Sequence, residues 1–366
     1  MANIYETLNP STDVSTTRTL LHEAIPLTGS IISGTYVEFG GATDTATNTK
    51  NYTHGMFQSV YDYPYLSSSS NHIFDITVGY SDNSPLSSSG NAQNGKKINM
   101  YSQCAQIALG YDLTGAIDVF ENDLNTADDS GQMKEVFFLN FSRLLVKDSI
   151  KKGSFSITLG TGSWASPFGD GGSARILTDA SASQLGYTAE GATGDWGLLY
   201  ESPASSSAFG AVFYNLGIVA ITSSAFRSSS ADGTPGLALN SNDQFALNNG
   251  TYYGITGSLT DLPITASADA FRHRISNLSF NNSVEINSTI YFCRAPTSKF
   301  NYSLNPTYTT GSRIRVKNEA TDTPRAFITT VGLYNASNQL IAVAKVSEPM
   351  EKKPGEEITY RVRLDY

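Results

Sequence analysis

Charge and cysteine are both scarce in this chain of 366 residues. Charged residues make up 16% of the sequence, against about a quarter in an average soluble domain. They comprise 24 Lys and Arg against 33 Asp and Glu, and the net charge of −9 comes with no basic cluster. Nucleic-acid binding draws most of its affinity from neutralised phosphates, so we expect no nucleic-acid partner. Two cysteines, Cys104 and Cys293, are too few for a disulfide framework or a thiolate metal site.

Long apolar runs and recognisable catalytic motifs are also missing. No apolar stretch approaches the roughly 18 residues that span a bilayer, so we expect no membrane partner. No Gly-x-Ser-x-Gly string is present to hold a nucleophilic serine. The sequence contains four histidines, none of them at metal-ligand spacing: His22, His54, His72 and His273. The sequence therefore predicts a protein without metal, without cofactor and without enzymatic activity.

Neutral polar residues and aromatic residues take the place of charge. Ser, Thr and Asn are abundant, and 20 Tyr and 18 Phe are too many for a chain that stays unfolded. Thr, Tyr and Phe favour pleated surfaces. We therefore predict a mainly β fold of two or three antiparallel β-sandwich-like domains. The predicted divisions are 1–160, a β-rich domain with one helix; 161–275, a Gly/Ser-rich β domain or insertion; and 276–366, a C-terminal β domain.

One conspicuous helix is expected near 92–109. Apolar residues recur there at steps of three and four, which is typical of one buried helical stripe, and Gly110 follows as a C-terminal stop. The stripe consists of Ile98, Tyr101, Cys104, Ala105 and Ala108. Cys104 on this stripe is interpreted as a small core residue rather than a nucleophile.

Alternating apolar and polar residues predict strands in several other segments. The segment 20–26 is expected to be a short helix that ends at Pro26, and 136–146 is the most apolar stretch and should be central. In 358–366 the alternation is strict, so one face should be core and the other solvent. Further strands are expected at 30–39, 73–80, 155–159, 210–222 and 284–294, with a turn at 335–338.

The C-terminal region resembles a known group of proteins. The string Phe327-Ile-Thr-Thr-Val-Gly-Leu-Tyr-Asn335, followed by Asn338-Gln-Leu-Ile-Ala-Val-Ala-Lys345, is similar to a strand–turn–strand motif of tailed-bacteriophage structural proteins. These include tail-fibre attachment modules and virion proteins of marine contractile-tailed phages of the T-even type. The segment 291–308 and the closing residues 361–366 resemble the same proteins. The resemblance covers about a quarter of the chain and implies a virion setting, with no catalytic residue.

The first functional hypothesis follows from that resemblance. It is a non-enzymatic virion component, such as a tail, baseplate or neck subunit or a tail-fibre attachment protein, that joins other virion proteins within a symmetric homo-oligomer. The segment 327–366 is expected to form a three-stranded amphipathic sheet, which cannot bury its apolar face alone and must pack on the rest of the chain or on a partner. The candidate interface residues, which could equally be core, are Phe327, Val331, Leu333, Tyr334, Leu340, Val343 and Tyr366.

Two alternatives remain open. In a receptor- or glycan-binding tail protein, Trp164, Trp196 and Tyr200 would form an aromatic platform for a glycan of the host surface. In a polysaccharide depolymerase, Asp195 or Glu201 would act as a catalytic carboxylate. Glycosidases hold two such groups about 5 or 7–9 Å apart, a separation that sequence does not reveal.

Overall fold

The fold is described by a computed structural model. It describes residues 5–28, 48–84, 87, 92–112, 114–124, 131–160, 168, 174–202, 208–226, 244–246, 252–254, 263–303, 305–311, 313–315, 319 and 321–366. The chain is mainly β, as predicted, and its principal sheet is large and antiparallel.

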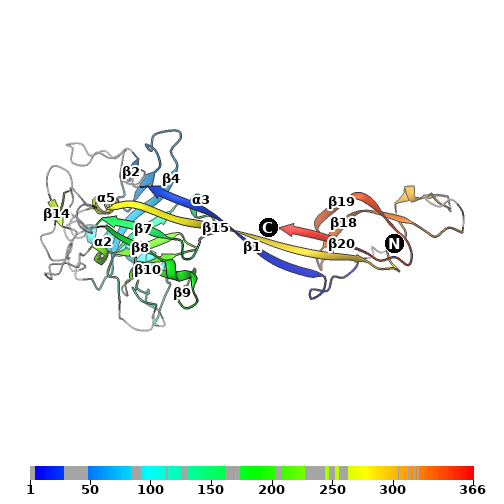
Figure 1. The fold of residues 1–366 in the computed structure, drawn as a ribbon, viewed down its shortest axis with the longest axis horizontal. Coiled ribbons are helices and arrows are strands. Elements are labelled where there is room, and N and C mark those ends of the chain that lie inside the picture. The colour runs from blue at the N-terminus through cyan, green and yellow to red at the C-terminus, as the bar shows by residue number, and fades with distance from the viewer. Residues whose placement is uncertain are drawn as a thin grey trace. The chain divides into compact units, whose positions relative to one another are not determined.

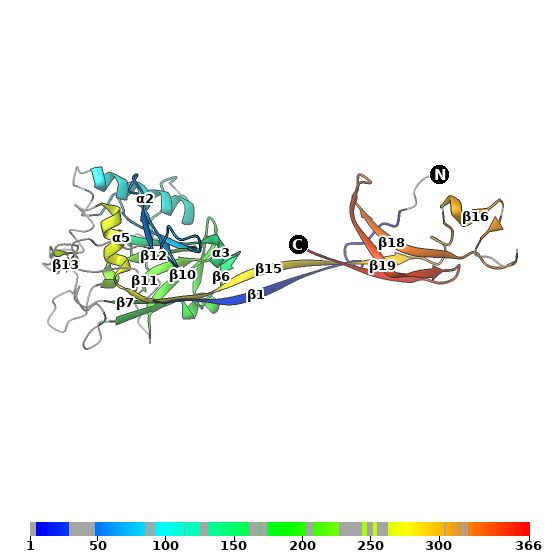
Figure 2. The same ribbon diagram turned by 90° about the horizontal axis from the view of Figure 1, so that it is seen from above.

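Two compact units make up the chain, one formed by Met1–Leu21 with Glu285–Tyr366 and the other by His22–Val284. This division differs from the predicted one at 160 and 275. β7 (Ser156–Gly160) pairs with β8 (Ala174–Thr178) across the first predicted boundary. β15 (Ile275–Ala295) begins at the second and continues without a break. β1 (Val14–Thr28) runs alongside β15 (Figures 1 and 2).

The unit His22–Val284 is built on the principal sheet. In sheet order after β15, its strands are β7, β8, β10 (Gly194–Glu201), β11 (Ala208–Phe213), β12 (Ile218–Thr222), β5 (Glu135–Phe141), β4 (His72–Tyr80), β3 (Gln58–Tyr61) and β2 (Thr49–Asn51). The helices are α2 (Ala92–Ala108), α3 (Arg143–Val146) and α5 (Ile264–Arg272), with 3-10 helices η1 (Ala180–Ser183) and η2 (Ser223–Phe226). The remaining short strands are β6 (Ser149–Ile150), β9 (Thr188–Gly191), β13 (Gln244–Ala246) and β14 (Tyr252–Gly254).

The central strand β5 buries side chains on both of its faces. Phe137 stacks on Phe271 of α5 with ring centroids 4.7 Å apart, and Phe141 packs against Phe280 of β15 at 5.0 Å. On the other face Phe138 meets Tyr101 of α2 at 6.3 Å. Because successive strand residues point to opposite faces, this one strand serves two separate cores. The layer formed by β5 therefore lies between β15 and α5 on one side and α2 on the other.

The predicted helix is confirmed as α2. Its buried positions include Tyr101, Ala105 and Ala108, but the stripe continues through Lys97 and not through Ile98. Gly110 has φ +96°, and its N–H donates to the carbonyl of Ala105 at 3.1 Å, which ends the helix as expected.

Most predicted strands of this unit are present. The segments 73–80 and 155–159 correspond to β4 and β7, and 210–222 forms the adjacent pair β11 and β12. The apolar stretch 136–146 divides into β5 and the short helix α3. The predicted strand at 30–39 lies outside the described residues.

The expected helix at 20–26 is wrong, because these residues belong to strand β1. The segment before it is rich in β-branched Thr, and the pairing of β1 with β15 satisfies its backbone groups. A pairing partner more than 250 residues away leaves no trace in the local pattern.

The unit of Met1–Leu21 and Glu285–Tyr366 is organised around the second half of β15. β20 (Ile358–Asp365) pairs with it from Ser288↔Asp365 to Ala295↔Ile358, and β1 takes its other edge, where the Phe292 N–H donates to the Asp13 carbonyl at 2.8 Å. β18 (Ala326–Tyr334) and β19 (Leu340–Lys352) form a separate two-stranded sheet. The remaining elements are η3 (Pro306–Tyr308), β16 (Thr309–Thr310) and β17 (Arg313–Ile314).

The expected three-stranded sheet of 327–366 is therefore wrong, since its third strand pairs with β15. The strict alternation along β20 is confirmed, because Tyr360, Val362 and Leu364 are more buried than the exposed Arg361 and Arg363 between them. Alternation fixes which side chains point inward but not which strand is the neighbour.

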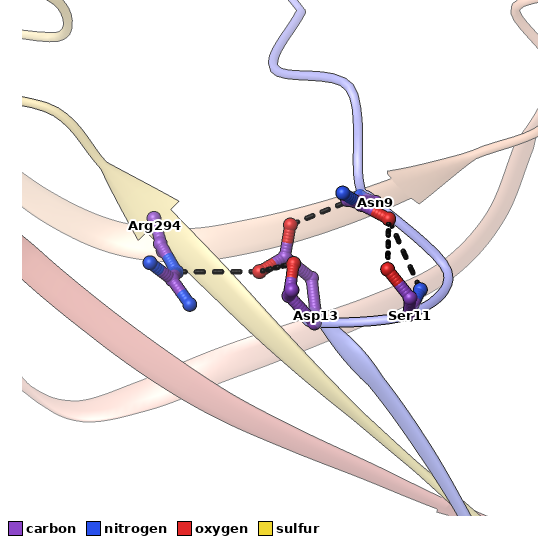
Figure 3. A network of polar contacts seen from close by, with 5 residues as sticks. Asn9, Ser11, Asp13 and Arg294 are labelled. Atoms are coloured by element: carbon purple, nitrogen blue, oxygen red, sulfur yellow. Dashed lines mark hydrogen bonds and ion pairs between the residues drawn. The ribbon is translucent and has the colours of Figure 1, made fainter.

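A polar network holds the start of β1 to β15 (Figure 3). The Asp13 carboxylate accepts the Asn9 N–H at 2.9 Å through Oδ2 and pairs with Arg294 Nε at 3.2 Å through Oδ1. The Asn9 side chain in turn accepts the Ser11 N–H at 3.0 Å and the Ser11 hydroxyl at 2.8 Å. The carboxylate thus connects a closed turn to the neighbouring strand.

A substitution at Gly79 of β4 tests how closely α2 packs on the sheet. A Cβ at this position would lie 2.7 Å from the Tyr101 backbone nitrogen and 2.8 Å from the Lys97 carbonyl oxygen. We expect Gly79→Ala to lower the free energy of unfolding by about 2 kcal/mol, because backbone atoms of a helix cannot yield locally. Urea unfolding followed by circular dichroism measures the change.

Gly95→Ala is the matched control for that variant. Gly95 lies inside α2, and a Cβ there would meet nothing within 4 Å. It should raise the free energy of unfolding by about 0.5–1 kcal/mol through helix propensity alone. Equal effects of the two variants would contradict the close approach of α2 to β4.

Candidate interaction surface

The hairpin β18–β19 contains most of the predicted interface residues, and a well-defined turn shapes it. The Asn335 side chain accepts the N–H groups of Ser337 at 3.0 Å and Gln339 at 2.8 Å, and the Asn335 N–H donates to the Gln339 carbonyl at 3.0 Å. Asn338 has φ +60°, a left-handed conformation that Asn tolerates. The predicted turn at 335–338 is confirmed, and it fixes the register in which the two strands meet.

One face of the hairpin exposes large apolar side chains. Tyr334 is 46% exposed, Leu340 53% and Val343 54%. Gly332 lies opposite Val343, and a Cβ on it would come within 3.0 Å of the Tyr334 ring and 3.2 Å of Leu340. The missing side chain therefore lets Tyr334 and Leu340 lie over the strand backbone. We call Gly332, Tyr334, Leu340, Ile341 and Val343 the hairpin surface; the exposed Phe327 lies beyond the register shift after Ile328.

The opposite face of the hairpin is apolar too. Val331 pairs with Ala344 and Leu333 with Ala342, and all four are half-buried. A sheet that divides solvent from core has one polar face, whereas this hairpin has apolar residues on both. Within the described residues, its two strands also have no neighbour on their outer edges. Within the described residues, Tyr5 packs against Tyr334 with ring centroids 5.0 Å apart, and the rest of the hairpin surface is exposed.

The predicted interface residues separate into two groups in the structure. Phe327, which is 49% exposed, lies on β18 with Val331, Leu333 and Tyr334, while Leu340 and Val343 lie on β19. Tyr366, 73% exposed, follows β20 and is held by backbone hydrogen bonds with Asn287. Sequence reasoning missed Ile341, which is 67% exposed. Ile341 lies two positions before Val343, so alternation places it on the same face, and the register shift after Leu333 brings Leu340 opposite Tyr334 beside it.

A buried ammonium group fixes the far end of β19. Lys352 is 0% exposed, and its Nζ donates to Asn301 Oδ1 at 2.7 Å, to the Glu356 carbonyl at 2.6 Å and to the Lys353 carbonyl at 3.0 Å. An ammonium has three hydrogens to donate, and here each has an oxygen acceptor. The hairpin is therefore anchored at its base while its turn end stays exposed.

The predicted aromatic platform does not assemble. Trp196 is 2% exposed and packs on Phe213 with ring centroids 5.8 Å apart, so its ring belongs to the core and offers no face to a sugar. Tyr200 is half-buried beside the same core, and Trp164 lies outside the described residues. Trp196 lies on the inner face of β10, within the core beneath α2.

The two carboxylates considered for a depolymerase are held apart. Asp195 and Glu201 lie six positions apart on the extended strand β10, which places their Cα atoms about 20 Å from each other. Each has its own cation, Lys152 for Asp195 and Arg175 for Glu201, the latter at 3.2 Å. This separation exceeds the range in which two carboxylates cleave a glycosidic bond.

Neither cysteine has the environment of a nucleophile. Burial raises the pKa of the Cys104 thiol to about 12, and burial together with the negative charge of Asp13 raises that of Cys293. Over the described ranges, no group of three or more His, Cys, Asp or Glu side chains could hold a metal ion. No helix in the described part of the chain has the length and apolar character to cross a bilayer.

Comparisons with known proteins add no relative. No protein-family model matches the chain, and the searches of curated proteins and of solved structures found no match. The resemblance to phage structural proteins therefore depends on the strand–turn–strand motif and on the segments 291–308 and 361–366.

Cys104 is half-buried and packs against the core beneath α2, and alkylation of its thiol tests this position. With a pKa near 12 rather than 9, its thiolate fraction at pH 8 falls from about one in ten to about one in ten thousand. We expect iodoacetamide to alkylate Cys104 of the folded protein roughly a thousandfold more slowly than in denaturant. Mass spectrometry of the Cys293→Ser variant isolates the signal, and rapid alkylation of the folded protein would contradict the assignment.

Proposed function

We propose that this chain is a non-enzymatic structural component of a tailed-phage particle, and that the hairpin surface joins it to other subunits. The observation that carries the proposal is the exposure of Tyr334, Leu340, Ile341 and Val343 on one hairpin. The same residues belong to the motif that resembles phage tail and baseplate proteins. Apolar side chains concentrated on one exposed element mark interaction sites in soluble proteins.

The composition of the surface favours a permanent contact. The exposed face of the hairpin has Thr330 and Lys345 at one end and only apolar residues and Gly332 toward the turn. A two-stranded sheet is marginally stable by itself, so a partner that covers this face also stabilises the hairpin. Repeated copies around a symmetry axis are the usual way in which such surfaces are covered. A tail, baseplate or neck ring, or a tail-fibre attachment site, provides that setting.

Two other functions were considered from the sequence, a polysaccharide depolymerase and a glycan-binding aromatic platform. Neither is supported by the residues predicted for it. Trp196 lies in the core, and the carboxylates of Asp195 and Glu201 have separate cationic partners. The structural role is therefore the function that the described residues support best.

Val343→Lys tests the hairpin surface. An ammonium in the middle of an apolar contact is costly to desolvate, so we expect the association constant of the homo-oligomer to fall at least tenfold. Sedimentation velocity over a concentration series measures the change, and circular dichroism verifies that the variant is folded.

Leu144→Lys is the matched control. Leu144 is 78% exposed on α3, so a lysine there changes an exposed apolar residue away from the hairpin. This control should assemble as the wild type does. The interface assignment fails if the wild type is monomeric throughout the series, or if both lysine variants assemble equally well.

A further inference from the structure

A cluster of aromatic rings and polar groups lies on the outer face of strands β2, β3 and β4 and on the connection between β2 and β3. Ser59 of β3 pairs with Asp75 of β4, and Tyr61 pairs with His72. On the opposite face of the same strands Val60 and Phe74 are fully buried. The outward side chains are therefore held on a rigid sheet whose inner face is core.

The polar centre of the cluster is the Asp75 carboxylate. Its Oδ1 accepts the Ser59 hydroxyl at 2.5 Å and contacts His72 Nε2 at 2.8 Å. Its Oδ2 accepts no hydrogen bond from the described residues, and the side chain is 24% exposed. Ser59 is 2% exposed, so a buried hydroxyl holds Oδ1 of the carboxylate. The other oxygen, Oδ2, can accept a hydrogen bond from a ligand. The Tyr52 hydroxyl lies 3.3 Å from Ser59 Oγ and adds a donor and acceptor beside it.

Two adjoining groups of rings lie around the carboxylate. Tyr52 stacks on His54 with centroids 5.1 Å apart, and Phe57 supports both rings at 4.9 and 5.0 Å. Next to Tyr52, Tyr61 contacts His72 at 5.6 Å and the exposed Tyr65 at 6.3 Å. Tyr52 and Tyr61 are half-buried, so packing orients each ring while part of it still meets solvent.

Two lysines and one carboxylate lie around the cluster. Lys50 Nζ lies 4.8 Å from the centre of the Tyr52 ring, and Lys50 pairs with Ser59, which in turn pairs with Asp75. Lys96 of α2 donates to the His54 carbonyl at 3.1 Å. Burial and the neighbouring Tyr52 and Asp75 raise the pKa of the Tyr61 hydroxyl, which stays protonated and can donate. With charges of both signs and neutral hydroxyl groups, this surface suits a neutral ligand better than a multiply charged one.

We infer that the outer face of β2–β4 is a binding site for a neutral carbohydrate, with Tyr52 and Tyr61 contacting the sugar rings and Asp75 accepting their hydroxyl groups. A sugar presents apolar C–H faces and a rim of hydroxyls, which requires aromatic rings beside a few fixed acceptors and donors. Asp75 Oδ2 provides the acceptor, and the Tyr52 and Tyr61 hydroxyls provide donors. The site goes beyond the structural role proposed above, and it does not use the hairpin surface.

An array of neutral oligosaccharides of glucose, galactose, mannose and N-acetylglucosamine tests the site with the full chain. We expect the wild type to bind at least one of them, and isothermal titration with that oligosaccharide gives the affinity. Tyr52→Ala and Asp75→Asn should each weaken binding at least tenfold. Asp75→Asn keeps the shape of the side chain, so it remains informative if Tyr52→Ala lowers stability.

Tyr187→Ala and Glu190→Gln are the matched controls, because both residues are exposed in the same unit but lie around β9. They should bind the oligosaccharide as the wild type does. The site is overturned if no oligosaccharide of the array binds, if binding survives both Tyr52→Ala and Asp75→Asn, or if the controls lose it equally. Adenosine serves as a stacking probe without a pyranose ring, and preferential binding of adenosine would also overturn the carbohydrate assignment.

Discussion

Burial of β5 on both faces is the constraint on which the unit His22–Val284 depends. A strand with Val136, Phe137, Phe138 and Leu139 in succession cannot leave either face to solvent. One face is covered by β15 and α5, the other by α2. α2 needs Gly79 on the neighbouring β4 to approach closely enough. Beyond that contact the outer face of β4 carries Asp75, and there the sheet presents polar and aromatic groups to solvent instead of core.

The two candidate surfaces differ in their chemistry, and the difference separates their roles. The hairpin surface has apolar side chains with no carboxylate among them, which suits a contact between proteins that excludes water. The face of β2–β4 has a fixed carboxylate between half-buried rings, which suits a small hydroxylated ligand. The hairpin surface lies on paired strands, and Ser59 and Asp75 do as well, whereas Tyr52, His54 and Phe57 belong to the connection between β2 and β3. Side chains on paired strands are already oriented before a partner arrives.

The sequence predicted those features whose cause is local. The stripe of α2, its stop at Gly110, the alternation along β20 and the turn at Asn335 all follow from residues a few positions apart. The neighbours of β1 and β20 did not follow, because both strands pair with the distant β15.

The same distinction holds for the candidate sites. The sequence alone could not show whether the apolar hairpin residues are exposed or buried, because apolar strand residues occur both in cores and in interfaces. The cluster at Asp75 was missed because three strands bring it together, although the density of tyrosines between 52 and 65 was a visible signal. For Trp196 the prediction failed in the other direction. It was expected on an exposed platform, but it is a core residue.

The central claim is that the hairpin surface is covered in an assembled phage particle. Oxidative footprinting with mass spectrometry, applied to the free chain and to purified particles from the source phage, tests it most directly. The account predicts that the chain is found in the particle and that Tyr334, Leu340 and Val343 are strongly protected there, while the exposed Leu144 and Leu185 react to similar extents in both samples. Absence of the chain from the particle, or equal labelling of the hairpin in both samples, would contradict it.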